Sequence, residues 1–208
     1  MIIIIDYGMG NLGSILNMLK RLGAPAKISR DVGEIESADR IILPGVGAFD
    51  TGMRHLRESG LVEVLNKKVL TDKVPVLGVC LGMQLLTKRS EEGEMPGLGW
   101  IDGWTMRFRF DERDSGLKIP HMGWNTVRPL RSDSLFRGLD ADSRFYFVHS
   151  YHVQCSREED ILAMTHFGYE FASAVQMSNV MGTQFHPEKS HKFGMKLLGN
   201  FCEWSYHC

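Results

Sequence analysis

Three short and almost wholly apolar runs constrain the fold of this chain more than any other feature. They lie at Ile2–Ile5, at residues 40–43 and at residues 74–79, and each is rich in isoleucine, valine or leucine. Runs of this length without alternating polar positions are typical of strands that are buried on both faces of a parallel sheet. The chain is therefore predicted to have an α/β fold.

Segments with helical spacing separate these runs. The clearest spans residues 12–22, where leucine or isoleucine recurs every three or four positions until Gly-Ala-Pro at 23–25. We expect further helices at residues 62–70 and 81–90, and a short strand at Ala26–Ser29. The resulting order of strands and helices predicts a mostly parallel sheet with helices on both faces.

The second half of the chain has a different pattern. Residues 100–110, 119–130, 145–155 and 161–185 are rich in aromatic and β-branched side chains and are interrupted by Gly, Asp and Ser. This pattern predicts antiparallel strands joined to the parallel sheet. A last helix is expected at residues 190–204, capped by Ser190, and no linker divides residues 1–208 into separate domains.

Composition excludes several classes of function. The 24 Lys and Arg balance 25 Asp and Glu, and no basic cluster favours a nucleic acid as partner. The opening apolar run is too short for a signal peptide or a membrane span. Four widely spaced cysteines without a C-x-x-C pair predict a cytoplasmic protein without disulfides. No metal is expected, because His149 and His152, three apart on one predicted strand, would face opposite sides.

The most informative segment is Gly78-Val79-Cys80-Leu81-Gly82, which lies between a predicted strand and a predicted helix. A nucleophile flanked by glycines at such a junction is typical of a strained strand-to-helix elbow. The helix N-terminus favours a thiolate, and the N–H of Leu81 could stabilise an oxyanion. The sequence therefore predicts Cys80 as a catalytic nucleophile, although a buried cysteine at a tight turn would have the same pattern.

A thiol nucleophile needs a base, and His186 is the best candidate. Pro187 is expected to hold the chain extended, so that His186 and Glu188 point to the same side. This arrangement predicts a Cys80–His186–Glu188 triad of nucleophile, base and orienting carboxylate.

Two glycine loops follow the first two apolar runs. Pro44-Gly45-Val46-Gly47 could supply a second oxyanion donor from Val46, or it could be an ordinary turn. Gly8-x-Gly10-x-x-Gly13 matches a dinucleotide fingerprint, with Asp31 at the distance of a ribose-binding acid. An NAD(P)-binding oxidoreductase is therefore the main rival hypothesis, and a binding scaffold with an inactive elbow is another.

Taken together, the motifs resemble the class I (triad) glutamine amidotransferase family, which has a flavodoxin-like fold. Within it the chain is most similar to the glutaminase subunits of imidazole glycerol phosphate synthases. The likeness is carried by the elbow, by the two glycine loops and by three further segments of the chain. Those segments are Pro120-His121-Met122-Gly123-Trp124-Asn125, Tyr146-Phe147-Val148-His149-Ser150-Tyr151 and Gly182-Thr183-Gln184-Phe185-His186-Pro187-Glu188-Lys189-Ser190.

The resemblance implies hydrolysis of glutamine to glutamate and ammonia through a Cys80 thioester, without a cofactor. It makes Val46 and Leu81 the oxyanion donors. It also implies a set of glutamine-binding residues and a set at the interface with a partner. The binding residues are Gly47, Gln84, Glu92, His149, Ser150 and Tyr151, and the interface residues are Asn11, Trp124, Asn125 and Lys189.

The implied partner is a (β/α)8-barrel cyclase, or synthase, subunit that receives the ammonia through a channel. The heterodimer would serve histidine biosynthesis, and the length of the chain leaves no room for the synthase itself. A paralogous glutaminase that feeds a sugar-amidating synthase of surface-polysaccharide pathways is the alternative. The charged residues 107–118 do not indicate which of these two kinds of glutaminase the chain resembles more.

Overall fold

The apolar runs of the first half form the centre of a mixed sheet. A computed structural model describes residues 1–110, 116–131 and 134–205 of the chain. In this part of the chain ten strands form one sheet, in which β2, β1, β3, β4 and β12 are successive parallel neighbours. These five strands are Ala26–Ser29, Ile2–Ile5, Arg40–Gly45, Val76–Cys80 and Val180–Thr183. The predicted mostly parallel core is confirmed.

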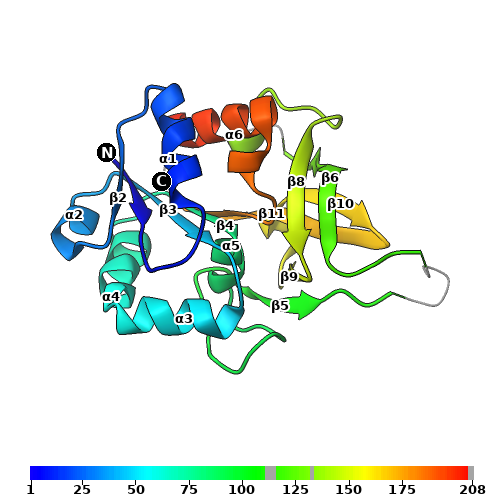
Figure 1. Cartoon of the computed structure of the whole chain (residues 1–208), viewed down its shortest axis with the longest axis horizontal. Coiled ribbons are helices and arrows are strands. Elements are labelled where there is room, and N and C mark those ends of the chain that lie inside the picture. Colours follow the sequence, from blue (N-terminus) through cyan, green and yellow to red (C-terminus); the bar gives the residue numbers. More distant parts are fainter. Residues whose placement is uncertain (111–115, 132–133, 206–208) are drawn as a thin grey trace.

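Helices cover both faces of this parallel part (Figure 1). Helices α1 and α6 pack on one face with Ile2 and Ile4, whereas α3, α4 and α5 pack on the other with Ile3 and Ile5. The bounds are α1 Leu12–Arg21, α2 Val32–Glu36, α3 Phe49–Glu58, α4 Leu61–Asn66, α5 Leu81–Leu85 and α6 His191–Glu203. Successive isoleucines of β1 thus pack into the hydrophobic cores on opposite faces of the sheet, because side chains alternate across a strand.

The antiparallel strands predicted for the second half continue the sheet from β12. Strand β11 pairs with β12, β10 and β9, and β5 adds to β9. Strands β6 and β8 form a separate two-stranded sheet, which lies beside β10 in Figure 1. The strands are β5 Gly103–Arg107, β6 His121–Thr126, β7 Arg128–Pro129, β8 Arg144–His149, β9 Tyr151–Cys155, β10 Ile161–Phe167 and β11 Tyr169–Met177.

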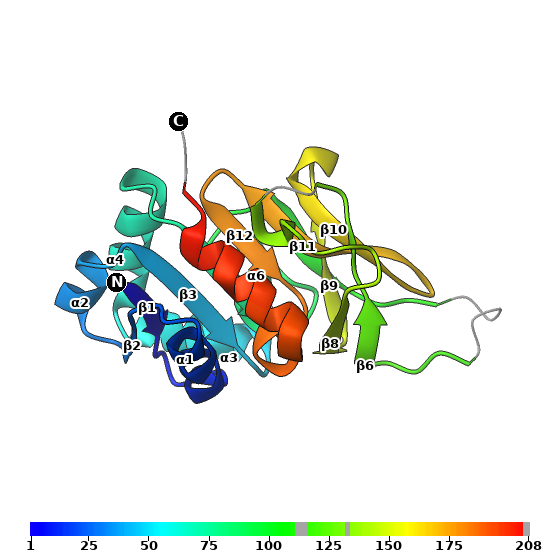
Figure 2. The ribbon, with the colours of Figure 1, turned by 90° about the horizontal axis from the view of Figure 1, so that it is seen from above.

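Strand β12 is the junction between the two halves of the fold. It runs parallel to β4 on one side and antiparallel to β11 on the other. Figure 2, seen from above, shows β12 and α6 between the parallel strands and the β8–β10 region. Because β4 ends at Cys80 and β12 leads to His186, adjacent pairing of these strands brings distant parts of the chain together.

Several predicted bounds were wrong. The helix expected at residues 81–90 ends at Leu85, because the carbonyls of Leu85 and Leu86 accept from Leu98 and Ile101 instead of continuing the helix. Helices α2 and α3 were not predicted. The helix expected at 62–70 is α4 followed by a π-helical turn, η1, at Lys67–Thr71.

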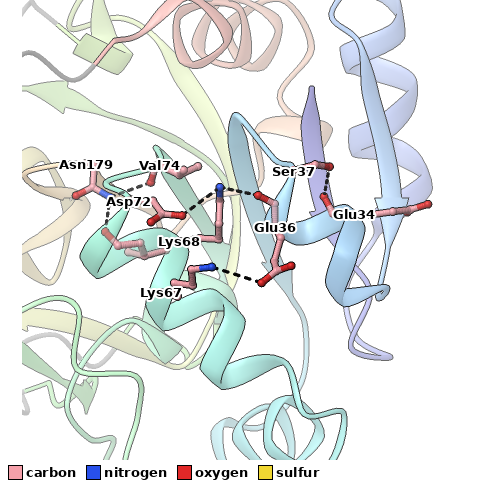
Figure 3. Close-up of polar contacts among 9 residues, drawn as sticks. Glu34, Glu36, Ser37, Lys67, Lys68, Asp72, Val74 and Asn179 are labelled. Carbon is pink, nitrogen blue, oxygen red and sulfur yellow. Dashed lines mark hydrogen bonds and ion pairs between the residues drawn. The ribbon is translucent and has the colours of Figure 1, made fainter.

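Polar contacts fasten η1 to its neighbours (Figure 3). The buried Lys68 amine donates to the Glu36 carbonyl at 2.8 Å and lies 3.4 Å from Asp72. The amide of Asn179, just before β12, donates to the carbonyls of Val69 and Val74. These bonds satisfy backbone groups at the end of the sheet opposite Cys80.

Two further observations concern the remaining sequence predictions. Of the charged segment 107–118, Arg109 pairs with Glu91, whereas residues 111–115 lie outside the described part. Cys208 also lies outside it. Among the described residues, none of the helices is both long and apolar enough to cross a bilayer.

Candidate active site

Cys80 sits where β4 turns directly into α5. Its backbone has φ +54° and ψ −112°, a conformation that non-glycine residues rarely adopt. A Cβ on Gly82 would lie 1.8 Å from the Leu43 carbonyl oxygen, and a Cβ on Gly78 would lie 2.8 Å from backbone atoms of Gly82. The predicted elbow is therefore present, and its two glycines are required by close backbone packing.

His186 and Glu188 follow β12 and point toward each other. The Nδ1 atom of His186 lies 2.8 Å from Oε1 of Glu188, and both side chains are almost fully buried. The predicted extended segment is wrong: Pro187–Lys189 is a 3-10 turn. Ser190 occupies the predicted N-cap position of α6, but its side chain does not cap the helix, because the hydroxyl donates to the His186 carbonyl at 2.6 Å and accepts from the Tyr146 N–H.

The protonation of His186 depends on both of its neighbours. Burial of the ring would by itself lower the pKa of His186, but interactions with the Cys80 sulfur and the Glu188 carboxylate raise it to about 9. In the described structure, Nε2 of His186 is buried without a hydrogen-bond partner. The ring is thus oriented by Glu188 and leaves its other nitrogen free for a proton transfer.

A cavity of about 310 Å³ opens at Cys80. Every residue that we predicted for catalysis or glutamine binding lines it except Glu188, which lies behind His186. The lining residues are Val46, Gly47, Cys80, Leu81, Gln84, Glu92, Pro120, Val148, His149, Ser150, Tyr151 and His186.

The loop after β3 lies beside the elbow, because β3 pairs in parallel with β4 and Gly45 is opposite Cys80. Val46 is 43% exposed, and Gly47 has a φ of +111° that favours glycine. The buried Tyr7 hydroxyl donates to the Pro44 carbonyl at 2.6 Å, a contact that was not predicted. Two backbone segments next to Cys80 could therefore each supply an oxyanion donor: the loop at Val46 and the start of α5 at Leu81.

Two hydrogen-bonded glutamine side chains, Gln84 and Gln184, lie next to Cys80, and this contact was also not predicted. Gln184 is fully buried and its Nε2 lies 3.8 Å from the Cys80 sulfur. Its Oε1 accepts from Nε2 of Gln84 at 3.1 Å, and Gln84 also donates to the Tyr151 carbonyl at 3.2 Å. The position of Gln184, two residues before His186, is the sequence signal that could have indicated it.

Glu92 reaches the cavity from an irregular loop. Its Oε2 accepts the N–H of Phe49 at 2.9 Å, at the start of α3. The Asp50 carboxylate in turn accepts the N–H groups of Glu94 and Met95, which holds this loop against α3. Burial raises the pKa of Glu92 despite the Phe49 bond.

The prediction that His149 and His152 face opposite sides is wrong. Their rings both pack on Phe108, with centroid distances of 5.3 and 4.8 Å. The reason is that the chain turns at Ser150 from β8 to β9, so the two residues belong to different strands. Among the described residues, no cluster of three or more His, Cys, Asp or Glu side chains could hold a metal ion.

The four predicted interface residues lie outside the cavity. Trp124 is 47% exposed and stacks on His191, with ring planes 5° apart. The exposed Lys189 places its amine 5.5 Å from the centre of the Tyr146 ring. Asn11 precedes α1, and Asn125 bonds to groups of its own chain.

The dinucleotide fingerprint has a local explanation. Gly8 and Gly10 have φ values of +83° and +103°, and a Cβ on Gly10 would lie 3.0 Å from the Pro44 side chain. The Asp31 carboxylate caps α2 by accepting the Glu34 N–H. The glycines thus serve a tight turn against the loop after β3, and Asp31 serves a helix terminus.

The other described cysteines differ from Cys80. Neither Cys155 nor Cys202 lines the cavity. Burial raises the pKa of Cys155 to about 12 and that of Cys202 to about 11, which makes both thiols poor nucleophiles at neutral pH.

Comparison with known proteins identifies relatives over almost the whole chain. The sequence profile of class I glutamine amidotransferases matches residues 3–204. The chain is 56% identical to imidazole glycerol phosphate synthase subunit HisH 2 of Pseudomonas aeruginosa, over 98% of this chain and 99% of that protein. It is 52% identical to subunit HisH of Bdellovibrio bacteriovorus, over 98% and 100%.

Solved structures support the fold alone, since their sequences are less similar. A crystal structure of a glutamine amidotransferase superposes with a TM-score of 0.75 at 23% identity, covering 97% of each chain. The PurLQS structure from Thermotoga maritima gives a TM-score of 0.74 at 16% identity, also covering 97% of each chain.

Proposed function

The chain belongs to the class I glutamine amidotransferase family, and from that premise we propose that it is the glutaminase subunit of an imidazole glycerol phosphate synthase. The family and the relatives named for that subunit supply the assignment. The observation that carries the chemistry is that Cys80 shares one cavity with His186, whose ring is held by Glu188. One glutamine amidotransferase domain, residues 1–208, contains all of these groups.

In the proposed reaction the Cys80 sulfur attacks the side-chain carboxamide carbon of glutamine. His186 takes the thiol proton and donates it to the nitrogen as the carbon–nitrogen bond breaks, so that ammonia leaves and a thioester remains. Water, deprotonated by His186, then attacks the thioester and releases glutamate and the thiol. Backbone N–H groups of Leu81 and Val46 stabilise the oxyanion formed in each half-reaction.

Binding of glutamine is assigned to the other residues that line the cavity. The Glu92 carboxylate, with one oxygen bonded to the Phe49 N–H, is suited to the α-ammonium group. Gln84, Gly47 and the backbone of His149, Ser150 and Tyr151 complete the site. The cavity volume of about 310 Å³ is at the small end of the range for ligand sites, as expected for a single amino acid.

We assign the ammonia to a partner subunit with a (β/α)8 barrel, reached through a channel across a heterodimer interface. The exposed Trp124, with Asn11, Asn125 and Lys189, forms the proposed contact surface, since a partly exposed tryptophan is a common interface anchor. The barrel would act as the lyase and cyclase of histidine biosynthesis. A reducing compartment keeps free thiols such as that of Cys80 reduced, so the proposed location is the cytoplasm.

Transfer of labelled nitrogen tests the acceptor. The chain, its barrel partner and glutamine labelled with ¹⁵N in the amide are incubated with the phosphoribosyl intermediate. Label is expected in the imidazole ring of imidazole glycerol phosphate. Release of labelled ammonia from glutamine without ring labelling, together with labelling of a sugar acceptor in a parallel incubation, would instead identify the sugar-amidating paralogue.

A further inference from the structure

The side chains of three buried histidines at or near the cavity have no part in the proposed chemistry. His121, His149 and His152 surround the Phe108 ring and are each less than 7% exposed. His121 and His149 are directly opposite each other on the paired strands β6 and β8. Buried polar rings are costly unless each nitrogen has a suitable partner, so their hydrogen bonds indicate what they do.

The Tyr151 carbonyl determines which ring nitrogens of His149 and His121 donate and which accept. Nδ1 of His149 lies 2.7 Å from the Tyr151 carbonyl oxygen, which can only accept, so Nδ1 carries the proton. Nε2 of the neutral His149 ring is then an acceptor. It lies 2.9 Å from Nδ1 of His121, which must therefore donate.

The same reasoning continues to Asn125. Nε2 of His121 is left as an acceptor, 3.1 Å from Nδ2 of Asn125. The second N–H of that amide donates to the His166 carbonyl at 3.0 Å, and its oxygen accepts the Thr126 N–H at 2.8 Å. The carbonyl and the N–H fix the amide orientation, so the chain of bonds runs from Asn125 through His121 and His149 to Tyr151.

Both rings are held in this neutral arrangement. Burial lowers the pKa of His121 to about 4 and that of His149 well below its usual range. The His121 ring is stacked between Phe147 and Phe167, with centroid distances of 4.6 and 4.2 Å. The aromatic neighbours thus prevent the ring from turning to another partner.

The last hydrogen bond of this series, from His149 to Tyr151, shapes the cavity wall. The bond from His149 to the Tyr151 carbonyl spans Ser150 and closes the turn between β8 and β9. The Ser150 carbonyl is fixed by the Phe108 N–H at 3.1 Å, and all three residues of the turn line the cavity. The same Tyr151 carbonyl accepts from Gln84.

We propose that Asn125, His121 and His149 are positioning residues, which hold the His149–Ser150–Tyr151 backbone in the form that binds glutamine. The inference rests on the proposed function and assigns to these side chains a task beyond it. None of the three side chains touches the reacting atoms. Since Asn125 is next to the exposed Trp124, the chain of bonds also links the proposed partner surface to the substrate cavity.

Two variants of equal shape test the bond between the histidines. Asparagine at position 121 keeps an N–H where Nδ1 was, whereas leucine of the same size has none. In the complex with the barrel partner, His121→Leu is expected to raise the KM for glutamine by about fivefold to tenfold, the usual effect of losing one buried hydrogen bond, with kcat almost unchanged. His121→Asn is expected to restore the KM to within about twofold of the unsubstituted chain.

His152→Leu is the matched control. His152 packs on the same Phe108 ring and bonds to the Tyr169 hydroxyl at 2.9 Å, outside the chain of bonds. It should lower stability to a similar extent without changing the KM. Equal KM values for His121→Leu and His121→Asn, or an equal rise in His152→Leu, would overturn the proposal.

A spectroscopic measurement keeps the proposal testable if His121→Leu does not fold. The ¹⁵N shifts of the histidine rings at neutral pH should show His121 and His149 protonated on Nδ1 and not on Nε2. Protonation of either ring on Nε2 would contradict the proposal. Because this measurement needs no substrate, it also separates the failure of the positioning role from a failure of the proposed glutaminase function.

Discussion

The hydroxyl of Tyr7 donates a 2.6 Å hydrogen bond to the carbonyl of Pro44 and thereby joins the loop after β1 to the end of β3. The two residues are 37 positions apart and meet because β1 and β3 are adjacent parallel strands. Pro44 lies two residues before Val46, the proposed oxyanion donor. The bond therefore restrains the peptide groups that must aim an N–H at the transition state.

Tyr7→Phe tests this restraint. Without the hydroxyl, the buried Pro44 carbonyl loses its partner, which should lower the unfolding free energy by about 1 kcal/mol. We expect a fall in kcat for glutamine and little change in KM, because the oxyanion forms only during reaction. Tyr169→Phe removes a phenol bonded to His152 and serves as the control. A kcat equal to that of the control would contradict the restraint.

Cys80→Ala should abolish glutamine-dependent synthesis, by roughly a thousandfold or more, because no nucleophile remains to form the thioester. Synthesis from added ammonium salt by the complex should persist, since the partner's reaction needs only ammonia. The buried Cys155, replaced by alanine, is the control for a lost thiol outside the cavity. Glutamine use by the Cys80 variant would show that the nucleophile is another group.

Glu188→Gln should lower the pKa of His186 from about 9, because the carboxylate that stabilises the charged imidazole is replaced by a neutral amide. Histidine ring NMR as a function of pH measures this directly. We also expect glutaminase activity to fall by at least about a hundredfold, as the ring loses its orienting acceptor. Glu170→Gln, in an exposed pair with Arg128, is the comparison variant. An unchanged His186 titration would refute the assigned role.

Stability should be greatest near pH 6.5. Burial lowers the pKa of His121 and of His152 to about 4 and holds that of His149 well below its usual range. Below pH 6.5 the unfolded chain therefore binds protons that the folded chain does not, and the unfolding free energy falls by roughly 1.4 kcal/mol per pH unit for each histidine.

His186 acts in the opposite direction. Its folded pKa of about 9 exceeds the unfolded value, so its contribution is complete below pH 6.5 and is lost as the pH rises toward 9. Urea unfolding across this range measures both effects, and His152→Asn should reduce the slope on the acid side. A stability that does not change between pH 6.5 and about 4.5 would be inconsistent with buried neutral histidines.

The chain without its partner should be a poor glutaminase. Val46 is 43% exposed on a loop with glycine on both sides, so we expect its N–H to become fully ordered only when a partner docks, even with the Tyr7 bond in place. Turnover of glutamine is to be measured for the chain alone, with its barrel partner, and with the partner plus its nucleotide ligand. Rates that are equal in all three would exclude activation by docking.

The parallel strands and the first helix of the first half could be predicted because each of them has a clear local pattern. Apolar runs identified β1, β3 and β4, and helical spacing identified α1. The two glycines flanking Cys80 identified the elbow, although the backbone that crowds Gly82 belongs to the neighbouring strand β3 and only that around Gly78 belongs to the turn itself. Helices α2 and α3 escaped prediction, and so did the early end of α5, where long-range hydrogen bonds to the carbonyls of Leu85 and Leu86 replace local ones.

The roles of the histidines could be predicted only in part. The pairing of His186 with Glu188 was expected, but it depends on a 3-10 turn and not on an extended segment. The contact between His121 and His149 depends on the register of β6 against β8. Register is a property of two separated strands, and neither strand's own sequence encodes its alignment.

By itself, the sequence determined the strands, the elbow and the residue types that could do thiol chemistry, because these follow from apolar periodicity and from the conformational freedom of glycine. Only the tertiary structure brought His186 into one cavity with the sulfur and placed the amides of Gln184 and Gln84 beside it. The physical reason is that β12 pairs with β4 on one side and β11 on the other, so one strand brings both halves of the site to the same edge.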